Sequence, residues 1–458
     1  IRFPGFTLRI NMAQAHTLST RVLIAYASLS LPLAALTMPV YIFLPTFYGD
    51  DLGLSLQSVG YVLFLARLVD VISDPIVGVF GDRTHNSFGR RKTWIVIGVI
   101  PTLIGTWTLM NPPADIAGIF GLVYLFTTSV VLYIGWTCLM IPLQAWGAEL
   151  STDYHERSRI SAWREGLTVT GLLGTLGMLA VLGYGEKENA GKALNAIAWM
   201  IIVLLPITVA LSVKFAPDFK ALKGPKMRFR DGIKVMAKNK PFRNLIASFL
   251  INSTANGLPA ILFIMYVRYV VQTPEYTAQL LFVYFLCGVL AVPLWLKLSY
   301  KFGKHRVWCG AMVWACAFFA LVPLVGPGDI WLYLAIVVLT GLALGADLVL
   351  PASMQADVVD KDILETGLQR TGLYFALWSM TTKLSLALAA GIAFPALDAM
   401  GFDGELGQNL WALIALYAIL PIVFKLIAIA IMARYPLDQK DVAEIRNQIS
   451  SKWSQSKN

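Results

Sequence analysis

Three charged residues stand close together in an otherwise apolar stretch of the sequence. Residues 67–75 read RLVDVISDP, and each bare charge in such a segment would be costly in lipid. Asp70 and Asp74 are four residues apart, so on a helix they share one face, which Arg67 borders. Carboxylate and hydroxyl oxygens can replace the water around a small cation such as Na⁺, and Ser73 adds a hydroxyl in the same turn. This spacing predicts a cation site.

The same residues also fit a structural role. Arg67, Asp70 and Asp74 could form an internal salt-bridge network with a basic residue elsewhere in the chain. Two acids with one local base leave a negative charge that needs a partner, which favours the cation site over this alternative.

Two further charges lie inside apolar runs. Lys383, in SMTTKLSLALAAG (379–391), is too deep in its run for its ammonium to extend easily to a membrane surface, so we expect it to be a counter-ion of Asp70 and Asp74. Asp347, in GLALGADLVLP (341–351), is either a polar packing residue or a substrate contact, and the sequence does not separate the two.

The composition indicates what kind of protein surrounds these charges. Of the 458 residues, 57% are hydrophobic and 14% charged, whereas soluble domains are about 25% charged. Twelve apolar runs are long enough to cross a bilayer, so the sequence predicts an all-α polytopic membrane protein. The predicted spans are 22–48, 56–81, 93–111, 117–142, 165–183, 193–215, 242–271, 276–300, 306–325, 330–350, 370–397 and 409–434.

Loop charges predict the orientation of these spans. Lys and Arg concentrate after the second, sixth and eighth spans. The positive-inside rule therefore puts both termini on the cytoplasmic side of the membrane, which we expect to be a bacterial-type inner membrane. The net charge of +10 is mostly this topology signal, because no nucleic-acid-binding motif accompanies it. The expected parts are a tail (1–21), a six-helix bundle (22–215), a basic linker (216–241), a second six-helix bundle (242–434) and a tail (435–458).

A short motif occurs twice. FGRRKTW (88–94) follows the second span and FGKHRVW (302–308) follows the eighth. Two similar halves joined by a linker are typical of transporters that rock about a central site.

The first copy belongs to GDRTHNSFGRRKTW (81–94), which resembles the loop signature of the major facilitator superfamily. Together with RLVDVISDP, AELSTDYHERSRISAWRE (148–165) and ADVVDKDILETGLQRTG (356–372), it resembles the glycoside–pentoside–hexuronide:cation symporters, the family of melibiose permease. The similarity covers all twelve spans. It implies the major facilitator fold, alternating access, and symport of a sugar with Na⁺ or H⁺.

The resemblance also implies roles for single residues. Asp70 and Asp74 match the family's cation-binding aspartates, and Thr137 matches a threonine that supports the same site. Lys383 matches the family's lysine in the eleventh span, which we assign to coupling. We assign Arg67, which borders the face of Asp70 and Asp74, to coupling as well. Ser73 stands where melibiose permease has an asparagine, which leaves the choice between Na⁺ and H⁺ open.

The substrate site departs from the family pattern. Two carboxylates, in the first and fourth spans, hold sugar hydroxyls in melibiose permease, but the matching segments 29–39 and 136–146 contain no acid here. Met140 and Gln144 replace an aspartate and a tryptophan. The polar residues that remain favour an anionic sugar as a set, although each of them, taken singly, fits a packed or interfacial polar group better than a ligand contact. The predicted contacts are Gln144, Arg164, Asn252, Asn256, Asp347, Trp378 and Lys383.

Acids and bases also alternate in the cytoplasmic segments. They are either solvated loop charges or a gate between the halves whose ion pairs break when the halves rock. The gate and loop residues are Asp82, Arg83, Gly89, Arg90, Arg91, Glu149, Asp153, Arg157, Asp357, Asp360 and Arg370.

Two other functional classes are alternatives to a sugar symporter. A carrier of a lysolipid or other amphiphile, or an exporter, would use the same fold. An enzyme is not expected, because the four histidines are scattered in loops and tails and the four cysteines lie in apolar spans, where they pack. We expect no cofactor besides the coupling ion, and function as a monomer in the bilayer.

Overall fold

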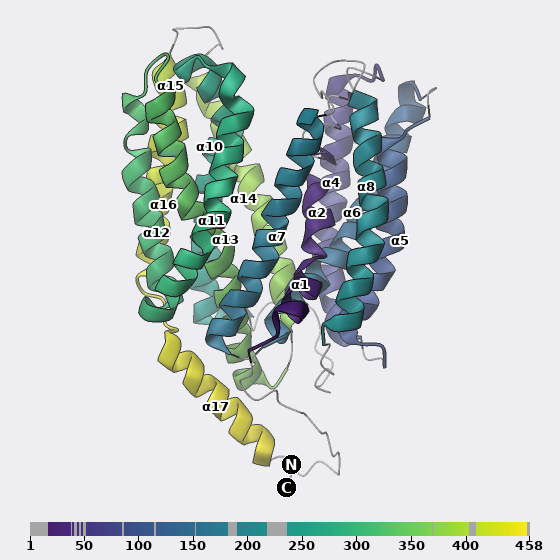
Figure 1. Cartoon of the computed structure of the whole chain (residues 1–458), viewed down its shortest axis with the longest axis vertical. Helices are drawn as coiled ribbons and strands as arrows, with labels where there is room; N and C mark the ends of the chain where they lie inside the picture. The colour runs from purple at the N-terminus through teal and green to yellow at the C-terminus, as the bar shows by residue number, and fades with distance from the viewer. Residues whose placement is uncertain are drawn as a thin grey trace.

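The computed structural model consists of long helices joined by short connections. It describes residues 17–37, 39–40, 44, 47–48, 52–84, 87–113, 116–151, 153–181, 190–217, 236–368, 370–402 and 409–455. Figure 1 shows the helices in two bundles that run side by side and meet at the lower end.

The first bundle contains α1 (Thr20–Ala27), α2 (Ser30–Ala35), α4 (Leu56–Arg83), α5 (Arg90–Met110), α6 (Gly118–Glu149), α7 (Tyr154–Val181) and α8 (Ala190–Phe215). The second contains α10 (Lys240–Tyr266), α11 (Thr277–Phe302), α12 (Lys304–Phe319), α13 (Ile330–Thr366), α14 (Thr371–Ala399), α15 (Leu410–Ile414) and α16 (Leu420–Met432). Short π- or 3₁₀-helical pieces lie at Val267–Val271, Pro274–Tyr276, Val322–Leu324 and Ala415–Ile419, and α17 (Gln439–Gln455) ends the described chain.

Nine helices of the described part are long and apolar enough to cross a membrane. They match the third, fourth and sixth to twelfth predicted spans. The second and fifth predicted spans are helical in α4 and α7, at 28 residues each, and neither is among these nine helices. The first predicted span (22–48) lies partly outside the described residues. The described residues thus form two bundles of long helices, as the sequence predicts.

The two copies of the repeated motif have the same local structure. Gly89 precedes α5 and Gly303 precedes α12, with φ angles of 117° and 87°. Glycine adopts such angles without strain, so the chain turns sharply and the next helix starts at once. The basic residue that follows is buried in both copies: Arg90 is 3% exposed and Lys304 1%.

The halves touch backbone to backbone where α4 crosses α14. A Cβ atom added to Gly78 would lie 2.7 Å from the carbonyl oxygen of Gly372, and one added to Gly372 would lie 2.6 Å from the carbonyl oxygen of Gly78. The absence of side chains at this crossing brings α4 and α14 close enough for charges on one to reach the other.

The two ends of the described chain lie near each other in the fold. The predicted C-terminal tail (435–458) contains α17, which packs against the end of α13 and against α7. Most of the predicted linker (216–241) lies outside the described residues. Leu18 donates its backbone N–H to Glu156, at the start of α7, at 3.0 Å. Arg446 of α17 lies 3.1 Å from Asp357, near the end of α13.

Candidate cation and substrate sites

Asp70 and Asp74 face Lys383 across the junction of the halves. Both acids lie on one face of α4, and they are 3% and 1% exposed. The Lys383 ammonium on α14 lies 2.7 Å from Asp70 Oδ2 and 2.8 Å from Asp74 Oδ2. One ammonium therefore bridges both carboxylates and joins the two bundles.

The other predicted cation-site residues surround the same carboxylates. The hydroxyl of Thr137, on α6, lies 3.1 Å from Asp70 Oδ1 and 3.0 Å from Asp74 Oδ1. Ser73 Oγ donates to the carbonyl oxygen of Asp70 at 2.8 Å and lies 3.3 Å from Thr137 Oγ1. Arg67 NH1 donates to Asp70 Oδ2 at 2.9 Å. The predicted set is thus one contiguous cluster.

The cluster is electrically balanced in this arrangement, because Asp70 and Asp74 meet Arg67 and Lys383. The internal salt-bridge network that the sequence left as an alternative is present, with Lys383 as the distant base. A small cation bound by the carboxylates and by Thr137 would take the place of the Lys383 ammonium. The donor set fits Na⁺, since all of these ligands are hard oxygen atoms.

Asp347 belongs to a second buried network, inside the second bundle. Asn252 and Asn256 donate to its Oδ1 and Oδ2 at 3.1 and 2.9 Å, and the Trp308 indole donates to Oδ1 at 2.6 Å. The Lys425 ammonium donates to both asparagine oxygens at 2.8 and 2.7 Å and lies 3.6 Å from Asp347 Oδ2. Lys425 thus donates two hydrogen bonds, both oxygens of Asp347 accept hydrogen bonds, and the two opposite charges lie within one network.

Lys425 was not among the predicted site residues. It is 2% exposed and stands alone in the apolar run LPIVFKLIAIAIM of α16, which is the same signal that identified Lys383. Because Asp347 has its partners within the bundle, its geometry favours polar packing, the first of the two roles left open, over substrate contact.

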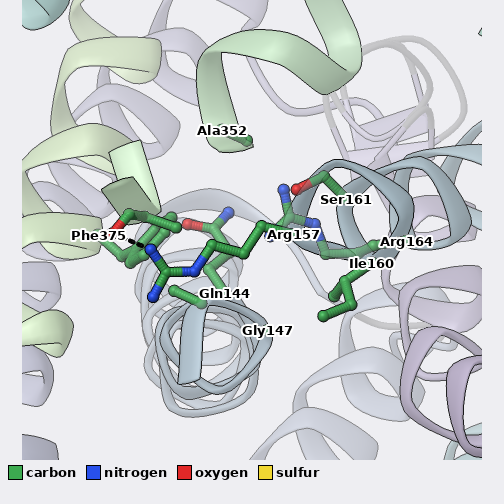
Figure 2. A pocket seen from close by; sticks show the side chains of 10 residues that line it. Gln144, Gly147, Arg157, Ile160, Ser161, Arg164, Ala352 and Phe375 are labelled. Atoms are coloured by element: carbon green, nitrogen blue, oxygen red, sulfur yellow. Dashed lines mark hydrogen bonds between the residues drawn. The ribbon is translucent and has the colours of Figure 1, made fainter. Parts of the chain in front are cut away.

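Gln144 and Arg164 line a small pocket between the halves. Figure 2 shows their side chains near Arg157, with Phe375 and Ala352 of the other half across the pocket. Arg164 is already paired, since its Nε and NH2 atoms lie 3.1 and 2.6 Å from Glu165 Oε1. The excess of positive groups that the sequence indicated is therefore absent in this arrangement: the charges of Arg164 and Lys383 are both neutralised.

Trp378, also predicted as a substrate contact, stacks on the ring of Phe249 with centroids 3.7 Å apart. Its side chain is 6% exposed. The pair joins α14 to α10, so Trp378 packs within the second bundle in this arrangement.

Three of the predicted gate residues meet across the halves. Arg157, at the start of α7, donates to Asp360 at 2.7 and 2.8 Å and to Asp357 at 3.2 Å. Lys304 lies 2.6 Å from Asp357, and Arg446 of α17 lies 3.1 Å from it. Burial lowers the pKa of Arg446 below its usual value, and the neighbouring Arg157 lowers it further.

Asp82 makes a second contact between the halves. Its carboxylate accepts the backbone N–H groups of Gly372 and Leu373 at 2.8 and 3.0 Å. These N–H groups belong to the first turn of α14, where the helix dipole favours a negative charge. Arg91 forms an ion pair with Asp82 at 2.8 Å.

The described contacts of the other gate residues lie within one half. Glu149 pairs with Arg90 and Arg91 at 2.5 and 2.6 Å. Arg370 Nε donates to Asp362 at 3.0 Å.

Three loop residues have local positions. Asp153 accepts the N–H groups of His155 and Glu156 at 2.9 and 2.8 Å, so it caps α7. Gly89 forms the turn before α5, and Arg83 is exposed at the last turn of α4.

Known proteins are similar to this chain over most of its length. The sequence profile of the family described as "MFS/sugar transport protein" matches residues 25–439. The inner membrane symporter YicJ of Escherichia coli is 25% identical, over 86% of this chain and 87% of its own length. The putative glycoside/cation symporter YagG of Escherichia coli is 23% identical, over 88% and 89%.

A relative with another kind of solute is similar too. The human sodium-dependent lysophosphatidylcholine symporter 1 is 24% identical, over 84% of this chain and 77% of its own. Among solved structures, a bacterial homologue of the iron transporter ferroportin in the outward-facing state superposes with a TM-score of 0.68 at 13% identity. That match covers 91% of this chain and 98% of the other, and it concerns the fold alone.

Proposed function

The chain belongs to the MFS/sugar transport protein family, and on that premise we propose that it is a secondary active transporter that couples a sugar or sugar-derived solute to Na⁺ or H⁺. The observation that carries the proposal is the contact of Lys383 with Asp70 and Asp74 at 2.7 and 2.8 Å. A charge that joins two moving halves and can be replaced by an ion provides a physical means of coupling. Relatives named as cation symporters support this function.

The coupling step follows from the charges. When a cation occupies the oxygens of Asp70 and Asp74, the ammonium of Lys383 loses both partners and becomes available to an anionic group of the solute. Cation and solute then assist each other's binding, and this assistance is reciprocal by linkage. Separation of α4 from α14 would also require that Lys383 leave the carboxylates.

We propose a sugar acid as the solute, because a released lysine suits an anion. The second candidate is a lysophospholipid-like amphiphile. It is favoured by the similarity to sodium-dependent lysophosphatidylcholine symporters, such as that of Danio rerio, 23% identical over 87% of this chain.

We further propose that the gate contacts lie on the cytoplasmic side, as the basic loops predict. The neighbouring position of Leu18 and α17, beside the start of α7 and the end of α13, is consistent with both termini on one side. Cysteine labelling of residues in the linker 216–241 from the outside should then fail. Labelling from the outside would contradict this orientation.

Transport by purified protein in liposomes tests the function. An imposed Na⁺ or proton gradient should drive accumulation of a labelled hexoside or uronate above its external concentration, with uronates preferred. Accumulation of lysophosphatidylcholine alone would establish the second candidate. Equal uptake with and without both gradients would overturn cation coupling.

A further inference from the structure

The pocket between the halves contains a polar atom without a partner. Within the part of the chain that the structure describes, Gln144 Oε1 is buried and accepts no hydrogen bond. It shares the pocket with Ser161 and Arg164 (Figure 2). A buried acceptor without a donor from the protein needs a donor from another molecule. A hydroxyl group of a bound solute would supply that donor.

Glu165 lies next to this pocket with capacity for further hydrogen bonds. Both bonds from Arg164 go to one carboxylate oxygen, Oε1, so Oε2 retains lone pairs for another donor. Glu165 follows Ser161 by four residues on α7, which puts it on the pocket-lining face one turn further along. Its side chain is 17% exposed, compared with 9% for Arg164. The carboxylate is therefore the more accessible partner of the pair.

The chemistry of this group is that of a hydroxyl-binding site. Arg164 and Glu165 together carry no net charge, and a free anion would have to displace Glu165 to reach the guanidinium. Sugar hydroxyls donate and accept at once, so they can bond to carboxylate, guanidinium and amide without displacing any of them. The ring of Phe375, across the pocket, offers an apolar face for the C–H groups of a sugar.

We propose that Glu165 supplies the sugar-binding carboxylate that the first and fourth spans lack. With Arg164 and Gln144 it forms a subsite for the hydroxyl groups of the solute. This inference rests on the proposed function and names the part of the site that recognises a polyhydroxylated solute rather than the hydrocarbon tail of an amphiphile.

The subsite is separate from the cation site. On α6, Gln144 follows Thr137 by seven residues, about 10 Å of helix, and on α14 Phe375 precedes Lys383 by eight residues, about 12 Å. Two helices from different halves thus give the same separation. A change at Glu165 should therefore alter the choice of solute while cation binding stays intact.

The test compares Glu165→Gln with Glu165→Asp and with a matched control, Glu365→Gln. Glu365 is 53% exposed and pairs only loosely with Lys361, at 3.6 Å. Glu365→Gln therefore removes one carboxylate, as Glu165→Gln does, but at an exposed position. The readouts are the thermal shift that Na⁺ causes in purified protein, and inhibition of cation-driven uptake by methyl glycosides and by uronates.

Glu165→Gln should weaken inhibition by methyl glycosides about tenfold to a hundredfold, the effect of losing a hydrogen bond to a charged group. Inhibition by uronates should weaken less, because Arg164 has then lost the carboxylate of Glu165 and attracts the carboxylate of the uronate. The Na⁺ shift should stay unchanged, and Glu165→Asp should restore part of the glycoside affinity. Glu365→Gln should behave as wild type.

Failure of this inference and failure of the proposed function look different. An equal loss for glycosides and uronates, or no loss, in a Glu165→Gln protein that keeps its Na⁺ shift would overturn the role of Glu165 alone. A wild-type protein that accumulates no sugar under either gradient would overturn the proposed function, and this inference with it.

Discussion

The ammonium of Lys383 lies 2.8 Å from a carboxylate oxygen of Asp74. The two residues come from helices of different halves, so this ion pair both balances a buried charge and links α14 to α4. In the proposed mechanism, a cation bound by Asp74 would compete with the ammonium of Lys383 for the same oxygens. Ion binding and the relative position of the halves would then be coupled by electrostatics.

Asp74→Asn tests this competition. The substitution removes one of two negative charges and leaves the size of the side chain nearly unchanged, so it separates electrostatics from packing. We expect cation affinity to fall about tenfold or more, and gradient-driven accumulation to vanish even if downhill exchange survives. Solute affinity should lose its cation dependence. Isothermal titration with Na⁺ and uptake in liposomes measure these effects.

Lys383→Ala is the matching control. If the lysine competes with the cation, its removal should preserve or tighten cation binding while it impairs coupled turnover. A purely structural salt bridge gives another pattern: Asp74→Asn would be less stable but would keep normal cation stimulation. Wild-type stimulation and uphill transport in Asp74→Asn would refute the cation site.

The glycine crossing gives a second prediction. Gly78→Ala puts a Cβ atom 2.7 Å from the backbone oxygen of Gly372, and overpacking of this kind costs about 1–3 kcal/mol. We call the arrangement in which Arg157 contacts Asp360 the closed gate, and the one in which this contact is broken the open gate. We expect the closed gate to lose that much stability relative to the open gate. A cysteine at Ser353, which is buried and 3.0 Å from Ser158 of the other half, should then react faster with an impermeant thiol reagent. The four native cysteines are replaced beforehand.

The control is Gly310→Ala, because a Cβ atom there meets nothing within 4 Å. Its labelling rate should match that of the parent protein. Unchanged labelling in Gly78→Ala would show that the crossing relaxes without opening the gate.

Most of the helical layout was predictable, because a lipid-facing helix must be apolar over about 20 residues. The predicted sixth span, 193–215, lies within α8 (Ala190–Phe215). The predicted tenth span ended at 350, whereas α13 continues to Thr366. Its last turns are polar and packed against protein, so hydropathy does not detect them. The polar helix α17 was missed for the same reason.

The site was predictable where a charge contrasts with an apolar run. Asp70, Asp74 and Lys383 stand out in this way, and Lys425 could have been found by the same rule. Glu165 could not, since it follows the polar stretch STDYHERSRISAWR and offers no contrast. Pairs such as Arg157 and Asp360, 203 residues apart, depend on how the halves pack, which no local pattern encodes.

The Asp347–Lys425 network gives a third prediction. Lys425→Met removes one partner of a buried pair and leaves the charge of Asp347 uncompensated, a change that costs about 3–5 kcal/mol. The double variant Lys425→Met with Asp347→Asn removes both charges and should recover most of that loss. Thermal melting of the four proteins in detergent gives the coupling energy. Additive losses would show that the two charges do not stabilise each other.

The fourth prediction concerns pH. The ring of His155, on α7, packs against Tyr300 of α11 with centroids 4.4 Å apart, and its Nε2 atom lies 3.1 Å from Gln439 of α17. The histidine is thus partly buried between the halves in this arrangement, which the proposed gate would take when closed. Burial lowers its pKa below 6.5; nearby Asp153 opposes this shift and Lys304 supports it.

A histidine whose pKa is lower in the closed gate binds its proton more weakly there than in the open gate. Above about pH 6.5, His155 is neutral in both arrangements, and the closed gate has its full stability. As the pH falls from 6.5 toward the lower pKa that His155 has in the closed gate, the histidine takes up its proton more readily in the open gate. The closed gate therefore loses stability over this range. We expect the cysteine at position 353 to label faster at pH 5.5 than at pH 7.5, by less than tenfold per pH unit, because one proton is involved. His155→Gln stays neutral and keeps a polar group beside Gln439, so it should lose this dependence after correction for the reagent's own pH profile. The same acid-induced increase in His155→Gln would assign the effect to another group.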